Sequence, residues 1–310
     1  MDDRLESGLV SEVSDFILFA QHGWADNDRA IAKMAQTLAT PHSLLIVPDL
    51  GWVKTWLRIQ PLIAQVEKIA SEAIDNYPHI PIRIMGHSMG GLIWLEVLQR
   101  HPEWWQKVES FVLVASPVGG ADLARILDPL GIGIGIAADL GKNRRQMAQA
   151  IAKVIPTLAI AGDVDGGSDG TITLETTKFP GAKWVCLPNL PHAILKNHPA
   201  VVEVIQEFWQ NPVITPAPPP DFTTTLIERL QSVPGMTDAH WRDFSRAKIY
   251  LTFPNGVTIR RWKNTVQVEH VFVANHQGEC LYGGFVGWVH IPALLQALGE
   301  IGKWELGEWG

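Results

Sequence analysis

Ser88 lies at the centre of the stretch Gly86-His87-Ser88-Met89-Gly90, where the sequence first suggests chemistry. Glycines two residues before and two residues after a serine let a strand turn sharply into a helix, with the hydroxyl at the apex. The flanking runs agree, because Ile82–Met85 is apolar and Gly90–Arg100 carries leucines at helical spacing. The pattern predicts a nucleophilic serine on a strained turn, and the competing interpretation is an ordinary strand-to-helix loop.

A serine hydroxyl is a weak nucleophile near neutral pH, so Ser88 needs a histidine as general base and an acid that orients it. The chain order expected after such a turn is serine, acid, histidine. His192 follows the apolar run Lys183–Leu187 and precedes a helix-like segment, which predicts a position at the edge where the strands end. We expect His198 to cap that helix or lie on the surface, and His87 to pack on the other side of the turn.

Three aspartates compete for the role of the acid in the stretch "GDVDGGSDGTITLE" after the run Thr157–Ala161. Asp169 is favoured because Asp-Gly-Thr-Ile-Thr leads into the next segment, whereas Asp163 begins the loop close to the strand. Asp165 is the second choice. The same spacing resembles a calcium loop, but Leu174 stands where the bidentate glutamate belongs, so we expect no metal site.

Acyl transfer also requires hydrogen-bond donors aimed at the oxyanion of the tetrahedral intermediate. One donor is expected from the amide of Met89, directly after the serine. The loop after the first strand, "FILFAQHGWADN", supplies the second, which we assign to the amide of Trp24, with Gly23 permitting a tight turn. A simple strand-end turn with a buried Trp24 is the alternative.

The elements that position these residues alternate between short apolar runs and longer segments with a 3.6-residue period as far as Trp209. This alternation predicts an α/β fold, a sheet of about six mostly parallel strands covered by helices on both faces. We expect a catalytic domain over residues 1–210 with a cap at about 117–156. Its stretch "DPLGIGIGIAADLG", with Ile132 and Ile134, suggests an acyl-chain surface, although close packing within the cap is the favoured interpretation.

Residues 211–220 include five prolines, which favour an extended linker. Residues 221–310 are predicted to form a small α+β domain, with an antiparallel hairpin at Asn255-Gly256 and a helix over Ile291–Ile301. A second helix is possible over Ala239–Ala247, and strands are expected over Thr265–Val273 and three further runs. We expect this domain to bind, dock or shield. Its aromatic residues form either a surface for an unknown protein partner or, the favoured interpretation, a buried sheet face: Trp262, Tyr282, Phe285 and Trp288.

Composition excludes several classes of function. The formal net charge of −7 and the absence of a basic run argue against nucleic acid as a partner. Cys186 and Cys280 are far apart, which indicates neither a disulfide framework nor a thiolate metal site. The acidic N-terminus lacks the pattern of a secretory signal, and no apolar run reaches the length of a transmembrane segment. We therefore expect a cytoplasmic protein without a cofactor.

The stretches "HGW", "GHSMGG", "ASPVGGADLA", "SDGTIT" and "PHAIL" together resemble the α/β-hydrolase superfamily, within it the lipase and esterase branch, over about Ser14 to Trp209. The resemblance implies a compact version of the fold without the two leading strands of larger members. It also implies roles for five residues: Ser88 as nucleophile, Asp169 as acid, His192 as base, and Trp24 and Met89 as oxyanion amides.

These features predict a serine hydrolase that cleaves carboxylic esters through a serine acyl-enzyme, with a small-molecule ester, lipids included, as substrate. Two alternatives remain open. One is an acyltransferase or thioesterase with the same triad, and the other is a non-catalytic binding protein that retains the fold.

Overall fold

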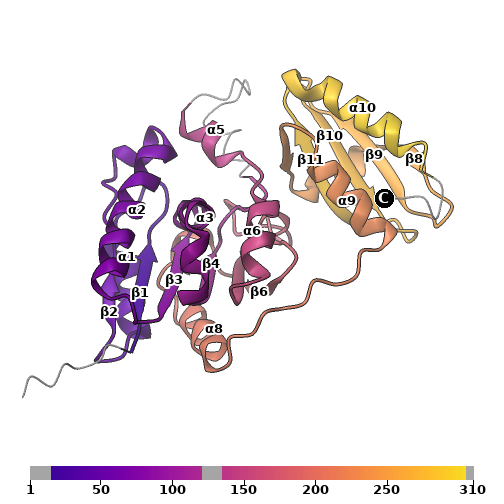
Figure 1. Cartoon of the computed structure of the whole chain (residues 1–310). Coiled ribbons are helices and arrows are strands. Elements are labelled where there is room, and N and C mark those ends of the chain that lie inside the picture. The colour runs from indigo at the N-terminus through magenta and orange to yellow at the C-terminus, as the bar shows by residue number, and fades with distance from the viewer. Residues whose placement is uncertain (1–14, 121–134, 305–310) are drawn as a thin grey trace, which may run out of the picture.

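The computed structural model describes residues 15–120 and 135–304, and its N-terminal part is built around one parallel sheet (Figure 1). All neighbouring strands of this sheet run parallel, in the order β2-β1-β3-β4-β5-β6. The predicted parallel α/β sheet is thereby confirmed. Its strands are β1 (Ile17–Gln21), β2 (Leu44–Ile46), β3 (Ile82–His87), β4 (Val108–Val114), β5 (Thr157–Asp163) and β6 (Ala182–Pro188).

Helices cover both faces of this sheet because successive strand residues point to opposite sides. Ile17 and Phe19 of β1 belong to the core under one group of helices, α2 (Ile59–Asn76), α3 (Met89–Arg100) and α6 (Arg145–Ala152). Leu18 and Ala20 belong to the core on the other face, under α1 (Asp28–Leu38) and α8 (Pro199–Gln210). The shorter helices are η1 (Lys54–Trp56), η2 (Pro102–Lys107), η3 (Glu175–Thr177) and α7 (His192–Leu195).

The start of α2 is fixed by a residue distant in sequence. Asp139, in the short helix α5 (Ile136–Leu140), accepts hydrogen bonds from the backbone N–H of Ile59 at 3.0 Å and from the side chain of Arg58 at 2.8 Å. A carboxylate at this place satisfies an amide that has no partner inside the helix. The helix α2 therefore begins at Ile59.

The predicted cap is only partly within the described residues. Ile132 and Ile134, which carry the acyl-chain hypothesis, lie outside them. The described remainder contains α5 and α6, and α6 packs Ala148 and Ile151 into the core against the sheet.

The C-terminal domain, residues 222–304, contains a second, antiparallel sheet in the order β7-β11-β10-β9-β8. The helices α9 (Phe222–Gln231) and α10 (Ile291–Ile301) supply core residues on one face of this sheet (Figure 1). The predicted hairpin at Asn255-Gly256 is confirmed, with Gly256 at φ 82°. The remaining elements are β7 (Met236–Asp238), η4 (Trp241–Arg246), β8 (Lys248–Thr252), β9 (Thr258–Lys263), β10 (Glu269–Ala274), β11 (Cys280–Val286) and η5 (Trp288–His290).

Two predictions in this domain need correction. The segment Ala239–Ala247 forms the six-residue 3-10 helix η4 rather than an α-helix. The strand expected from Thr265 begins only at Glu269, because the Asn264 side chain accepts the amides of Val266 and Val268 and holds a turn.

The four aromatic residues named in the sequence analysis of this domain divide between core and surface. Tyr282 and Phe285 are buried, Trp262 is half-buried, and Trp288 is 48% exposed. Residues 211–220 run as an extended and largely exposed segment between α8 and α9 (Figure 1). Over residues 15–120 and 135–304, no helix has the length and apolar character that crossing a membrane requires.

Candidate active site

Ser88 occupies a strained turn between β3 and α3. Its backbone lies at φ 54° and ψ −123°, outside the regions that L-residues favour, and its N–H donates to the carbonyl of Val114 at 2.8 Å. A Cβ at Gly86 would collide with the backbone of Gly91, and a Cβ at Gly90 with the carbonyl of Gln21. Both glycines are therefore required for the strand, turn and helix to pack this closely.

The loop His22-Gly23-Trp24 lies directly beside Ser88. The strand β1 connects to β2 on one side and neighbours β3 on the other, so the chain reverses direction across the sheet here, and such points form crevices at the carboxyl ends of strands. A Cβ at Gly23 would lie 2.9 Å from the Cβ of Ser88. Among the described residues, the amides of Trp24 and Met89 have no hydrogen-bond partner.

His22 has a role that the sequence did not indicate. Its Nε2 accepts the N–H of Leu50 at 3.0 Å, so the proton lies on Nδ1, which donates to the carbonyl of Gly23 at 3.0 Å. That carbonyl belongs to the same peptide unit as the amide N–H of Trp24. His22 thus fixes the direction in which the Trp24 amide points, and its complete burial excludes competing water.

Asp169 and His192 are in direct contact. Nδ1 of His192 donates to Oδ2 of Asp169 at 2.7 Å, and the backbone N–H of His192 donates to the carbonyl of Asp169 at 2.9 Å. The other carboxylate oxygen of Asp169, Oδ1, accepts the amides of Thr171 at 2.9 Å and Ile172 at 2.6 Å. Asp169 is 2% exposed, so its orientation is fixed on both sides.

The other two aspartates bind the loop itself. Asp163 accepts the amides of Asp165 and Gly166, and Asp165 accepts the amide and the hydroxyl of Ser168. In the described part of the chain, neither carboxylate forms a hydrogen bond or ion pair with His192, which leaves Asp169 as the carboxylate beside the histidine among the three candidates.

The prediction that His87 packs on the other side of the turn is wrong, because His87 contacts His192. Its Nε2 donates to the backbone carbonyl of His192 at 3.1 Å, and the two imidazole rings lie 4.8 Å apart. Burial, together with the charge that His192 carries when protonated, holds the pKa of His87 well below its ordinary value of 6.5. A neutral His87 therefore supports the backbone of His192. His198 caps α8 as expected, since its Nδ1 accepts the amide of Ala200 at 3.2 Å.

Ser88, Asp169 and His192 follow β3, β5 and β6, so all three lie at the carboxyl edge of the parallel sheet. Within residues 15–120 and 135–304, no hydrogen bond joins the Ser88 hydroxyl to His192. Catalytic hydrogen bonds in unliganded enzymes are often long and tighten when substrate binds. The arrangement provides a serine on a strained turn, a carboxylate-bound histidine and two amides without partners.

Aromatic side chains gather next to the loop of Trp24. The ring of Trp56 lies 4.3 Å from that of Trp24 and 5.4 Å from that of Trp52. Trp52 is 52% exposed and Trp56 is 37% exposed, so the cluster presents aromatic surface to solvent next to the loop of Trp24. No three His, Cys, Asp or Glu side chains are grouped to hold a metal ion in the described part of the chain.

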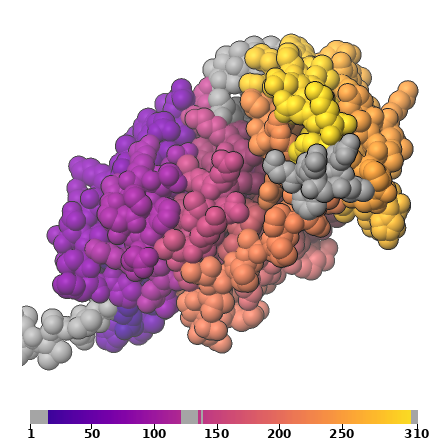
Figure 2. Space-filling view, turned by 45° about the vertical axis from the view of Figure 1, so that its right-hand side comes forward, coloured from indigo at the N-terminus to yellow at the C-terminus, as the bar shows by residue number. Residues whose placement is uncertain are grey.

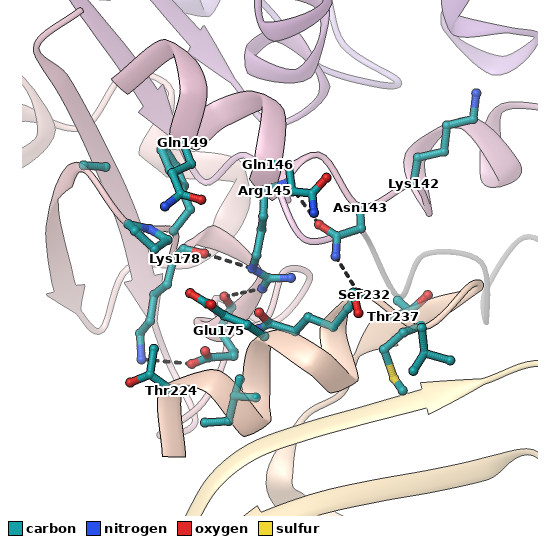
Figure 3. A pocket seen from close by; sticks show the side chains of 18 of the residues that line it. Lys142, Asn143, Arg145, Gln146, Gln149, Glu175, Lys178, Thr224, Ser232 and Thr237 are labelled. Atoms are coloured by element: carbon teal, nitrogen blue, oxygen red, sulfur yellow. Dashed lines mark hydrogen bonds and ion pairs between the residues drawn. The ribbon is translucent and has the colours of Figure 1, made fainter. Parts of the chain in front are cut away.

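A cavity of about 1110 Å³ lies elsewhere, between the two domains (Figure 3). Arg145 stands at its centre, where its guanidinium donates to the carbonyls of Glu175 and Lys178, and Asn143 bridges to α9 through the carbonyl of Gln231 at 2.8 Å. Ser88, Asp169 and His192 are not among the residues that line it.

The chain is similar to known proteins in sequence family and in fold. Residues 51–234 match the family model described as serine aminopeptidase, S33, a span that includes Ser88, Asp169 and His192. Among curated proteins, no sequence matches significantly.

The chain is also similar to solved structures at low sequence identity. The structure of Est1E from Butyrivibrio proteoclasticus with bound ferulic acid is 14% identical, with a TM-score of 0.51 over 64% of this chain and 90% of that chain. The lipase BlEst2 from Bacillus licheniformis is 16% identical, with a TM-score of 0.48 over 66% and 95% of the two chains. From the matched residues and the sheet order, the chain belongs to the serine aminopeptidase S33 family of α/β-hydrolase-fold serine hydrolases.

Proposed function

We propose that this hydrolase cleaves carboxylic esters with Ser88 as nucleophile, His192 as general base and Asp169 as the acid that orients the base. The hydrogen bond of 2.7 Å between His192 and Asp169, at the edge of the sheet where Ser88 turns, carries the proposal. It requires the proton of neutral His192 to lie on Nδ1. The other ring nitrogen, Nε2, is then free to accept the proton of a serine hydroxyl.

In the first half of the reaction, Ser88 Oγ attacks the ester carbonyl and its proton passes to Nε2 of His192. Asp169 stabilises the imidazolium that forms. The amides of Trp24 and Met89 donate to the oxyanion, the first of them aligned by His22. His192 then returns the proton to the leaving alcohol, which departs and leaves the acyl group on Ser88.

In the second half, His192 removes a proton from a water molecule, which attacks the acyl-enzyme. The same two amides stabilise the second oxyanion, and the carboxylic acid leaves as Ser88 regains its proton. The exposed aromatic side chains of Trp52 and Trp56 support a substrate with an apolar acyl or alcohol group.

The test is hydrolysis of p-nitrophenyl esters from acetate to palmitate by the wild type and by Ser88→Ala. We expect hydrolysis by the wild type and a loss of at least about 10³-fold in kcat for the variant. Equal rates for the two proteins on every ester would refute the proposal. The same assay with an added alcohol or thiol distinguishes an acyltransferase from a hydrolase, and L-alanine p-nitroanilide tests the cleavage of an amide.

A further inference from the structure

We infer that the C-terminal domain completes the active site by holding the acid loop, residues 163–170, in place through His240 and Trp241. The inference rests on the proposed function, because this loop carries Asp169. It assigns a positioning role in catalysis to two residues that lie 75 positions away in sequence from the loop residues they contact.

Two hydrogen bonds join the C-terminal domain to the acid loop. Nε2 of His240 lies 3.3 Å from Oδ1 of Asp165, and Nε1 of Trp241 donates to the carbonyl of Gly166 at 3.0 Å. Both donors come from the start of η4, directly after β7. The contacts therefore link the antiparallel sheet to the loop between β5 and β6.

The tautomer of His240 is set by its other nitrogen. Nδ1 accepts the backbone N–H of Arg242 at 2.9 Å and so caps η4, which leaves the proton on Nε2. Nε2 is then a donor toward Asp165 while the ring is neutral. The His240 side chain is only 10% exposed, so water has little access to this hydrogen bond.

The surroundings of Gly167 show how closely the acid loop packs against His240 and Trp241 of the C-terminal domain. A Cβ at this position would lie 2.6 Å from Nε1 of Trp241 and 2.7 Å from Nε2 of His240. Real side chains do not approach so closely, so any larger residue here would require the side chains of Trp241 and His240 to shift. The same residue donates its N–H to Asp165 at 3.3 Å, which places it within the hydrogen-bond network of the loop.

The path from His240 to Asp169 is short. Asp165 accepts the amide of Ser168 at 2.8 Å and also its hydroxyl, and that hydroxyl accepts the amide of Gly170 at 3.1 Å. Asp169 lies between these two anchored residues. Burial acts to raise the pKa of Asp165, but the hydrogen bonds from Ser168 and His240 outweigh it and lower the pKa, so the carboxylate stays ionised as an acceptor.

A second contact joins the C-terminal domain to the region around the segment that follows the acid loop. Asp238, two residues before His240, forms a buried ion pair with Arg145 of α6. Arg145 also donates to the carbonyls of Glu175 at 3.0 Å and Lys178 at 3.1 Å. The segment from the acid loop through η3 is therefore held against the C-terminal domain at two places, and in the space-filling view the two domains lie against each other (Figure 2).

The test compares two identical substitutions in the full chain. Trp241→Phe removes the hydrogen bond to Gly166 from a side chain that is 49% exposed. Trp288→Phe is the matched control, since Trp288 is 48% exposed and its Nε1 donates at 2.8 Å to Val266 within the C-terminal domain itself. A second pair separates the roles of His240: His240→Asn keeps an acceptor for the cap without reaching Asp165, whereas His240→Gln restores a donor at that reach.

We expect Trp241→Phe and His240→Asn to lower kcat on p-nitrophenyl acetate by about tenfold with little change in KM, because a displaced Asp169 affects chemistry more than binding. His240→Gln should recover most of the loss, and Trp288→Phe should equal the wild type. Hydrogen exchange of the amides in 163–172 should quicken in the two impaired variants only.

Exchange and kcat in Trp241→Phe and His240→Asn that match Trp288→Phe would overturn the inference. Faster exchange in the loop without a fall in kcat would also overturn it, since the contacts would then hold the loop without serving catalysis. A wild type that hydrolyses none of the substrates would instead refute the proposed function, and the exchange data would still decide whether His240 and Trp241 hold the loop.

Discussion

Replacing Asp169 by asparagine tests the proposed chemistry most directly, because the change keeps the shape of the side chain. Oδ1 of Asp169 accepts two backbone amides, from Thr171 and Ile172, and Oδ2 accepts Nδ1 of His192. In Asp169→Asn the side-chain amide oxygen must take the position of Oδ1, since an NH₂ group there would face the two N–H donors of Thr171 and Ile172. The NH₂ group then faces His192.

A donor facing Nδ1 reverses the tautomer of His192. Nδ1 becomes the acceptor and the proton moves to Nε2. With this proton bound, Nε2 can no longer accept the proton of Ser88. The imidazolium of the transition state also loses its carboxylate. For this kind of change in a serine triad the fall in kcat is about 10⁴-fold, which corresponds to about 5.5 kcal/mol of transition-state stabilisation.

The measurement is kcat on p-nitrophenyl acetate, with urea unfolding to verify that each variant is folded. Asp165→Asn is the matched control, because it lies in the same loop and keeps an acceptor for Ser168, so we expect a loss of at most about tenfold. The reasoning fails if Asp169→Asn keeps more than a tenth of the wild-type kcat, or if Asp165→Asn loses as much as Asp169→Asn.

Three further predictions concern stability and reactivity. Gly90→Ala drives a Cβ into the carbonyl of Gln21 and should destabilise the fold by roughly 3 kcal/mol in urea unfolding, whereas an unchanged midpoint would contradict the close packing of the turn. His87→Gln should flatten the dependence of the free energy of unfolding on pH. Because the pKa of His87 is lowered in the native state, below about pH 6.5 the unfolded chain binds a proton at His87 that the native state does not bind, and the wild type loses up to about 1.4 kcal/mol of stability per pH unit as the pH falls. Equal slopes of the free energy of unfolding for both proteins between pH 7.5 and 5.5 would disprove this. Burial raises the pKa of the Cys280 thiol to about 11, so alkylation by iodoacetamide at pH 8 should run about 100-fold slower than for a thiol with a pKa of 9.0, and comparable rates would show that the thiol is not buried.

The sequence was sufficient for the parts of the fold that depend on local patterns. The glycine spacing around Ser88 predicts a turn whose backbone is strained, and the structure shows why, since Gly86 and Gly90 each contact backbone directly. Apolar runs of four to six residues predict strands buried on both faces, and the central strands of the sheet are such strands.

Contacts between distant residues could not be predicted in this way. Asp163, Asp165 and Asp169 have the same chemistry and lie in one loop, and only the folded loop brings one of them to His192. The contact of His240 with Asp165 depends on how two domains meet. The short strand β7 was missed because it has only three residues and follows Pro234-Gly235, so no alternation is visible.

The extended segment 211–220 has a consequence for how firmly the C-terminal domain must bind. Because both domains are on one chain, their association is intramolecular, and a short tether of this kind maintains an effective concentration in the millimolar range. Contacts too weak to join separate chains at micromolar concentration are then sufficient. A single protease cut among these exposed residues would remove that advantage, and the two fragments would then stay together only through their own contacts.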